Sequence, residues 1–284
     1  GGGGGNGGAS HADATADDPS AEVFAVSAGV AAVAFAVYVR TLCPSVPGGD
    51  SGELVQVALD AGVVHPPGYP TWTMLAYLSS WLPVGDLAWR LNLSSALFDA
   101  LACGCLSAAV GLWGGCAWTG AAAGGAFGFS PLVWLYATQA EVFALNNLCN
   151  ALLLLLLVRF DIQVRVDRSR SLRAAAAGAW AIGLALTNQH TMVLFCAPYA
   201  LWSLGRGGIH LLRPRALAAL CAAGLLGLSP YLYLVSHGGA TAAWGSWGYH
   251  RSLGGLWTHV TRGEYGTFRL ASIDEATNTQ TWLR

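Results

Sequence analysis

The sequence predicts an all-α protein, a polytopic bundle of membrane-spanning helices. Of its 284 residues, 54% are hydrophobic and only 10% are charged, whereas ordinary globular domains carry about 25% charged residues. Several apolar runs approach the roughly 20 residues that a bilayer-spanning helix needs. The formal net charge of −1 provides no electrostatic attraction for nucleic acid, so a nucleic-acid-binding function is excluded.

Seven apolar runs are expected to span the membrane. They cover residues 21–42, 91–113, 117–137, 142–158, 174–187, 192–204 and 216–235. Around them we expect a Gly-rich disordered cytosolic tail over 1–20, a transmembrane bundle over 21–236 with its first lumenal loop at 43–90, and a lumenal aromatic and basic segment over 237–284 that continues beyond this sequence. The seven Cys show no CxxC or Cys/His ligand spacing, so neither a metal site nor a disulfide framework is expected.

The run 71–84 decides the topology. It is aromatic-rich but short, and Pro70 and Pro83 bracket it. If it lies on the far leaflet as an interfacial helix and the N-terminus is cytosolic, both Arg-rich loops fall in the cytosol, where short basic loops are retained. These loops carry Arg159, Arg165, Arg168, Arg170 and Arg173, and Arg206, Arg213 and Arg215.

This topology places on the lumenal face the polar side chains that could take part in catalysis or binding. They are Asp50, Glu53, His65, Arg90, Glu141, Asn188, Gln189, His190 and the chain from His237 onward. Acidic residues that gather at one surface, rather than at mid-bilayer, favour a surface site over a transport path.

Asp50 and Glu53 allow two interpretations. Three residues apart at a helix start, they share a face, and a carboxylate just outside the bilayer can accept a proton from a hydroxyl. The same Asp-x-x-Glu spacing is also that of a capping box, with Asp50 as N-cap and Glu53 at N3. The two roles are compatible, because a cap would hold the carboxylate in place.

Three further segments belong either to a site or to the scaffold. The Pro-rich stretch from His65 to Pro70 is stiff, which suits either a rigid site or a plain connector. Glu141 begins a span, where it is a functional candidate or simply a favourable charge at a helix N-terminus. Asn188, Gln189 and His190 form either a tight lumenal hairpin or part of a phosphate contact.

The C-terminal segment mixes aromatic residues with Arg262 and Tyr265. Aromatic side chains mark membrane interfaces. Arg and His among them could also hold a lipid phosphate by charge-assisted hydrogen bonds. An aromatic belt with solvated charges is the simpler alternative.

Taken together and in order, several motifs resemble those of the transmembrane protein 260 family. They are Pro47-Gly-Gly-Asp-Ser-Gly-Glu53, His65-Pro-Pro-Gly-Tyr-Pro70, Trp89-Arg-Leu-Asn92, Ala140-Glu-Val-Phe-Ala-Leu-Asn-Asn147, Thr187-Asn-Gln-His190 and Glu264-Tyr-Gly-Thr267. The resemblance covers roughly residues 30–270. It implies a multi-spanning transferase that uses lipid-linked sugars, with surface helices in its first lumenal loop.

The resemblance further implies an inverting protein O-mannosyltransferase of the endoplasmic reticulum membrane. Dolichyl-phosphate mannose would be a substrate, no cofactor or metal would be needed, and the acceptors would be lumenal proteins with IPT-like domains. Asp50 and Glu53 would be catalytic, and Glu141, Asn188 and Gln189 would support them. The donor phosphate would be bound by residues drawn from His65, Arg90, His190, Arg262 and Tyr265. The alternative is a membrane transporter or lipid-binding protein without transferase activity.

Overall fold

The computed structural model describes residues 19–168, 171–238, 245–248 and 252–263, and helices dominate this part of the chain. In chain order the helices are α1 (Pro19–Arg40), α2 (Ser51–Leu59), α3 (Pro70–Ser80), α4 (Leu87–Gly114), α5 (Ala117–Gly128), α6 (Pro131–Ala137), α7 (Val142–Val166), α8 (Ser171–Leu186), the 3-10 turn η2 (His190–Met192), α9 (Val193–Gly207), α10 (Ile209–Leu212), α11 (Pro214–Gly227), α12 (Tyr231–His237) and α13 (Leu253–Val260).

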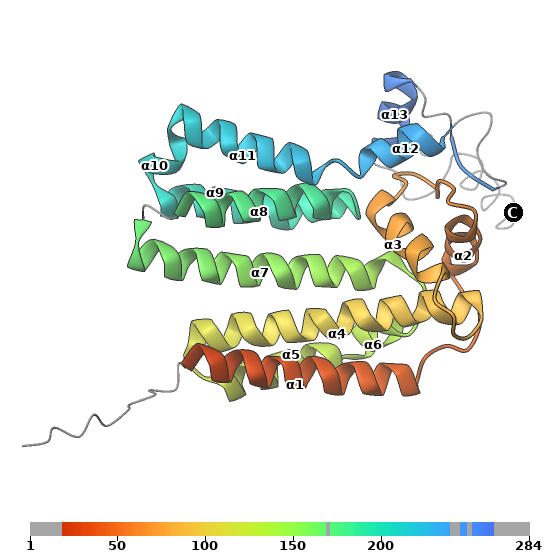
Figure 1. The fold of residues 1–284 in the computed structure, drawn as a ribbon, viewed down its shortest axis with the longest axis horizontal. Coiled ribbons are helices and arrows are strands. Elements are labelled where there is room, and N and C mark those ends of the chain that lie inside the picture. Colours follow the sequence, from red (N-terminus) through yellow and green to blue (C-terminus); the bar gives the residue numbers. More distant parts are fainter. Residues whose placement is uncertain (1–18, 169–170, 239–244, 249–251, 264–284) are drawn as a thin grey trace, which may run out of the picture.

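The longer helices lie side by side along the long axis of the molecule, and the short ones cap its ends (Figure 1). We call one end the α2–α3 end, because α2, α3, α12 and α13 gather there. The end of α7, the start of α8 and the α9–α11 connection, in or near which the Arg residues of the two predicted loops fall in the sequence, lie at the opposite end. This arrangement agrees with the topology obtained by counting spans and Arg residues.

The polytopic membrane bundle predicted from the sequence is confirmed. In the described part of the chain, α1, α4 and α7 are long and apolar enough to cross a membrane. The pair α11–α12, bent by 40°, makes a fourth candidate span, and α8 is a shorter apolar helix. Leu194, Leu225 and Leu232 are 77%, 68% and 70% exposed, as expected for side chains that face lipid.

Two predicted spans are not continuous helices. The run 117–137 divides into α5 and α6, because Ser130 precedes Pro131 and is extended (φ −68°, ψ 142°). A residue before proline disfavours helical geometry. The run 216–235 divides in the same way before α12, at Pro230, which lacks the N–H needed to continue a helix.

Several boundaries also differ from the prediction. Helix α4 begins four residues before the predicted residue 91, and α7 continues eight residues past 158. The surface helix expected over 71–84 is present as α3 but ends at Ser80. The first span starts at Pro19, inside the predicted tail, whose residues 1–18 lie outside the described part of the chain.

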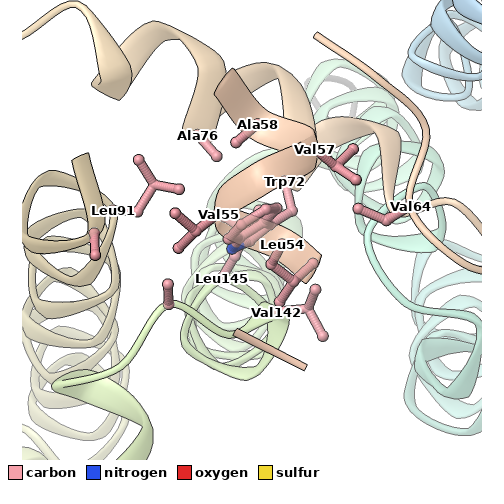
Figure 2. Packing of buried hydrophobic residues seen from close by; sticks show 12 residues of the cluster. Leu54, Val55, Val57, Ala58, Val64, Trp72, Ala76, Leu91, Val142 and Leu145 are labelled. Atoms are coloured by element: carbon pink, nitrogen blue, oxygen red, sulfur yellow. The ribbon is translucent and has the colours of Figure 1, made fainter. Parts of the chain in front are cut away.

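A compact apolar core fastens the first loop to the bundle (Figure 2). Leu54 and Val57 of α2 and Trp72 of α3 are almost fully buried, and they pack with Leu91 of α4 and Leu145 of α7. Fully burying such side chains contributes about 1.5–3 kcal/mol each. The helices that carry the polar residues are therefore held firmly against the spans.

Small residues let the spans approach closely. A Cβ atom on Gly183 of α8 would collide with Gly224 O of α11 and come within 2.9 Å of Gly227 Cα. Close backbone approach through small residues is typical of helix pairs in membranes.

Candidate active site

Asp50 directly precedes helix α2, but its side chain does not cap the helix. Asp50 occupies the N-cap position with helical backbone angles, and its carboxylate makes no capping hydrogen bond. The Asp50 side chain is 62% exposed. Glu53 turns toward His65 rather than back to the helix start. The capping-box alternative is therefore wrong, and both carboxylates are available for other contacts.

Glu53 and His65 form a tightly coupled pair. The Glu53 carboxylate accepts hydrogen bonds from the His65 backbone N–H at 2.7 Å and from its Nδ1 at 3.0 Å. Burial alone would raise the pKa of Glu53, but these hydrogen bonds and the imidazole charge outweigh it and hold the pKa below its ordinary value. For His65, burial opposes protonation, yet Glu53 and Asp50 together raise the imidazole pKa.

The other ring nitrogen of His65, Nε2, is directed toward Asp50. Nε2 lies 3.8 Å from Asp50 Oδ2 and 3.4 Å from the hydroxyl of Tyr69. Glu53, His65 and Asp50 thus form a chain of carboxylate, imidazole and carboxylate that ends in the exposed group. The raised pKa of His65 favours its imidazolium form, which places a positive charge beside the Asp50 carboxylate.

The part of the first loop that carries His65 packs against the C-terminal helices α12 and α13. The Gly68 N–H donates to His65 O at 2.8 Å. Gly68 has φ +93°, and a Cβ there would come within 2.9 Å of Leu234 and 3.1 Å of His259. Only glycine fits this left-handed position against α12 and α13. The segment from His65 to Pro70 is therefore a packed part of the site rather than a loose connector.

Glu141 is buried and contacts the backbone of Asp50. It is 5% exposed and precedes α7. Its Oε1 accepts hydrogen bonds from the Asp50 backbone N–H at 3.2 Å and from Ser51 Oγ at 3.5 Å. Burial and the nearby Asp50 charge raise the pKa of Glu141 to about 7. The sequence placed Glu141 at the correct end of the bundle, but not in contact with α2.

The turn between α8 and α9 lies at the same end. Asn188 Nδ2 donates to Val142 O at 3.3 Å. His190 Nε2 lies 2.9 Å from the Tyr231 hydroxyl, which in turn lies 3.0 Å from Leu186 O. When Tyr231 donates its proton to Nε2, the ring proton of neutral His190 is on Nδ1 and can be donated to a ligand. Burial, followed by the Arg262 charge, lowers the pKa of His190, so His190 provides a neutral hydrogen-bonding group.

Arg262 supplies positive charge to this region. It lies just after α13 with φ +58°. Its charge contributes to the lowered pKa of His190 and opposes, without reversing, the rise in the pKa of His65. The structure therefore brings together Asp50, Glu53, His65, Glu141, His190 and Arg262. In addition, the buried side-chain oxygens of Asn188 and Gln189 lack a hydrogen-bond partner among the described residues.

Two predicted site residues are not part of this cluster as described. Tyr265 lies outside the described residues. Arg90 donates to the carbonyls of Ser80 at 2.6 Å, Val84 at 2.7 Å and Gly85 at 2.9 Å, so three of its five donors hold the turn between α3 and α4. No group of three His, Cys, Asp or Glu side chains suited to a metal ion occurs within the described ranges.

Sequence reasoning missed three residues of structural or functional interest. Tyr231 joins His190 to α12, and no local pattern marks it. Trp72 donates from Nε1 to Glu141 O at 3.1 Å. Asp99, fully buried in α4, accepts from Asn147 Nδ2 at 2.9 Å. An acidic residue inside an apolar run was a readable signal for Asp99.

Fold and site together define a polytopic all-helical membrane protein with an acidic and imidazole-bearing cluster where its first loop meets the bundle. Residues 50–206, more than half of the chain, match the family model described as the Protein O-mannosyl-transferase TMEM260 N-terminal domain. The chain belongs to this family.

Two curated relatives carry the name Protein O-mannosyl-transferase TMEM260. The Mus musculus protein is 43% identical over 264 residues, which cover 90% of this chain and 37% of the relative. The Dictyostelium discoideum protein is 38% identical over 250 residues, which cover 84% of this chain and 30% of the relative. The chain thus spans about a third of the length of these relatives. No solved structure matches it.

Proposed function

We propose that this chain provides the catalytic membrane domain of a protein O-mannosyltransferase. The enzyme would move mannose from dolichyl-phosphate mannose to a Ser or Thr hydroxyl of a protein acceptor at the lumenal face of the endoplasmic reticulum membrane. The observation that carries this proposal is the exposed Asp50 carboxylate, 3.8 Å from an imidazole that Glu53 orients. The names of the relatives supply the class of reaction.

The reaction would be a single displacement with inversion. Asp50 accepts the proton of the acceptor hydroxyl while the hydroxyl oxygen bonds to the anomeric carbon of mannose. The bond from that carbon to the phosphate oxygen breaks, and dolichyl phosphate leaves with the electron pair. The positive form of His65, which the raised imidazole pKa favours, lies beside the Asp50 carboxylate before this step.

The donor phosphate is assigned to the region of His190 and Arg262. The Arg262 guanidinium provides charge and the His190 imidazole provides a neutral hydrogen bond, a combination suited to a phosphate leaving group. Nearby lies a groove of about 560 Å³, lined almost entirely by apolar side chains. Its lining residues are Ala222, Leu225, Leu226, Leu228, Ser229, Tyr231, Leu232 and Leu256.

Tyr231 connects the two parts of this donor site. It lines the apolar groove and also contacts His190 through its hydroxyl. A ligand with a long isoprenoid chain and a phosphate head fits this succession of apolar and polar surfaces. By resemblance to the transmembrane protein 260 family, the acceptors would be lumenal proteins with IPT-like domains. Neither a metal nor a cofactor has a role in this scheme.

The proposal is tested with the full-length protein of which this chain is a part. Purified protein in liposomes is incubated with labelled dolichyl-phosphate mannose and an IPT-domain acceptor. We expect label on Ser or Thr of the acceptor. Label that crosses into the vesicle lumen without reaching the acceptor would support the transporter alternative. Retention of donor lipid without transfer or flux would support a lipid-binding protein.

A further inference from the structure

Helix α2 lacks the cap that its sequence offers. Asp50 is a strongly favoured N-cap residue type, yet its side chain makes no hydrogen bond to the first turn. The first N–H groups of a helix need partners when they are shielded from water. Ser51, the first residue of α2, is fully buried, so this helix start needs another acceptor.

Glu141, at the start of helix α7, supplies that acceptor. Its Oε1 lies 3.2 Å from the Asp50 backbone nitrogen and 3.5 Å from Ser51 Oγ. Gly49 makes room for it, since it has φ +74° and a Cβ there would lie only 3.0 Å from Glu141 Oε1. An acceptor at this place also complements the partial positive charge of a helix N-terminus.

Glu141 is itself held firmly. The backbone of residues 140–142 is engaged by three side chains from three segments: Asn92 Oδ1 accepts from the Ala140 N–H at 2.8 Å, Trp72 Nε1 donates to Glu141 O at 3.1 Å, and Asn188 Nδ2 donates to Val142 O at 3.3 Å. The start of α7 is therefore a fixed point, and its position sets that of the α2 start.

We propose that Glu141 is a positioning residue that caps α2 from α7 and so leaves the Asp50 carboxylate free for the acceptor hydroxyl. A carboxylate used as its own helix cap would face the backbone instead of the substrate. With the cap supplied by Glu141, Asp50 keeps a fixed backbone while its side chain stays exposed and near His65. This inference rests on the proposed function and adds a role for a residue outside the reacting atoms.

Three substitutions test it in the full-length protein. Glu141→Ala removes the acceptor, and Glu141→Asp withdraws it by one methylene. Either change is expected to lower kcat about 10- to 100-fold with little change in KM, because small misplacements of a reacting group cost that much. Glu141→Gln keeps an oxygen at the same place and is expected to stay within about threefold of wild type. Glu22→Ala, at an exposed glutamate in the first turn of α1, is the control.

A double-mutant cycle separates positioning from general stability. If Glu141 acts through Asp50, Glu141→Ala combined with Asp50→Asn is no slower than Asp50→Asn alone. If the two losses multiply, Glu141 acts independently of Asp50 and the proposal is overturned. Wild-type kcat in Glu141→Asp would overturn it as well, and that milder variant decides the matter if Glu141→Ala does not fold.

Hydrogen exchange provides a measurement that needs no substrate. Exchange at the backbone amides of Asp50 and Ser51 is expected to accelerate in Glu141→Ala and Glu141→Asp but not in Glu141→Gln or Glu22→Ala. If wild type fails to transfer mannose, the proposed function fails while this measurement still decides whether Glu141 caps α2. Unchanged exchange in all variants would contradict the cap itself.

Discussion

Glu53 accepts two hydrogen bonds from one residue, His65: one from the backbone N–H at 2.7 Å and one from Nδ1 at 3.0 Å. The first fixes the backbone of the loop and the second fixes the imidazole ring. Nε2 is thereby directed toward Asp50 at 3.8 Å. Orientation of an imidazole by a carboxylate on its other nitrogen is a recurrent device of acid–base sites.

Glu53→Gln should therefore change the pH dependence of stability. The Glu53 pKa is lowered from 4.5, so its contribution is present above 4.5 and is lost as pH falls through the folded value. The His65 pKa is raised from 6.5, so its contribution is present below 6.5 and is lost as pH rises through the folded value. The free energy of unfolding of the variant should be lower by about 1–2 kcal/mol. The loss should be greatest between pH 4.5 and pH 6.5, where both contributions are fully present in wild type.

Thermal unfolding in detergent across this pH range checks that expectation. Glu22→Gln, at the start of α1, is the matched control. A stability difference between wild type and Glu53→Gln that stays constant with pH would show that the charged pair does not form.

His190→Ala should weaken the use of the donor. Its imidazole lies 2.9 Å from Tyr231 and close enough to Arg262 for that charge to lower its pKa. Loss of one hydrogen bond to a charged phosphate costs about 1.5–3 kcal/mol, or roughly 10- to 100-fold in KM for dolichyl-phosphate mannose. Steady-state kinetics with varied donor measure it, with the exposed His210→Ala as control. An unchanged donor KM would remove His190 from the donor site.

Arg90→Gln should act on stability rather than on donor binding. The guanidinium holds three carbonyls of the turn between α3 and α4. We expect a loss of about 1–3 kcal/mol, because those carbonyls lose charge-assisted partners. Thermal unfolding measures this loss, and Arg213→Gln on the exposed α10–α11 connection is the control. A raised donor KM without a loss of stability would return Arg90 to the phosphate site.

Asn92→Ala should be among the most destabilising single changes in this chain. Asn92 is fully buried, donates to Cys43 O at 2.8 Å and Ser45 O at 3.0 Å, and accepts from the Ala140 N–H at 2.8 Å. Its removal leaves the buried Ala140 N–H without this partner, which costs about 1–3 kcal/mol, and takes a donor away from the two partly buried carbonyls of Cys43 and Ser45. The expression level and the thermal unfolding temperature of Asn92→Ala should fall well below those of Gln56→Ala on α2. Wild-type stability would contradict this role.

The burial of Asn92 also predicts that its glycosylation sequon is not used. Asn92-Leu-Ser94 matches the glycosylation pattern, but the side chain has no access to solvent. Mass spectrometry of the protein from a glycosylating host should find this site unmodified.

Much of the fold was readable from the sequence because membrane helices follow composition. Apolar runs and Arg counts place Asp50, Glu53, His65, Glu141 and His190 at one end of the bundle, where the structure also has them. The break before Pro131 was readable too, since proline restricts the preceding residue.

Partner choice within the site was not readable. Whether Asp50 caps its own helix depends on how closely α7 approaches α2, and Gly49 permits an approach that no local pattern reveals. The contact of His190 with Tyr231 joins residues 41 apart. Such contacts depend on how helices pack, which propensity and periodicity do not specify.

The most direct test of the account is the rate of mannose transfer by Asp50→Asn in the full-length protein. Loss of a positioned acid–base group lowers rate about 10²–10⁴-fold. Because the Asp50 side chain is exposed and caps nothing, membrane insertion and thermal stability should be unchanged. Asp60→Asn, at the exposed C-terminal end of the same helix, should transfer mannose at the wild-type rate. Near-normal transfer by Asp50→Asn would contradict the assignment of Asp50 as the catalytic base.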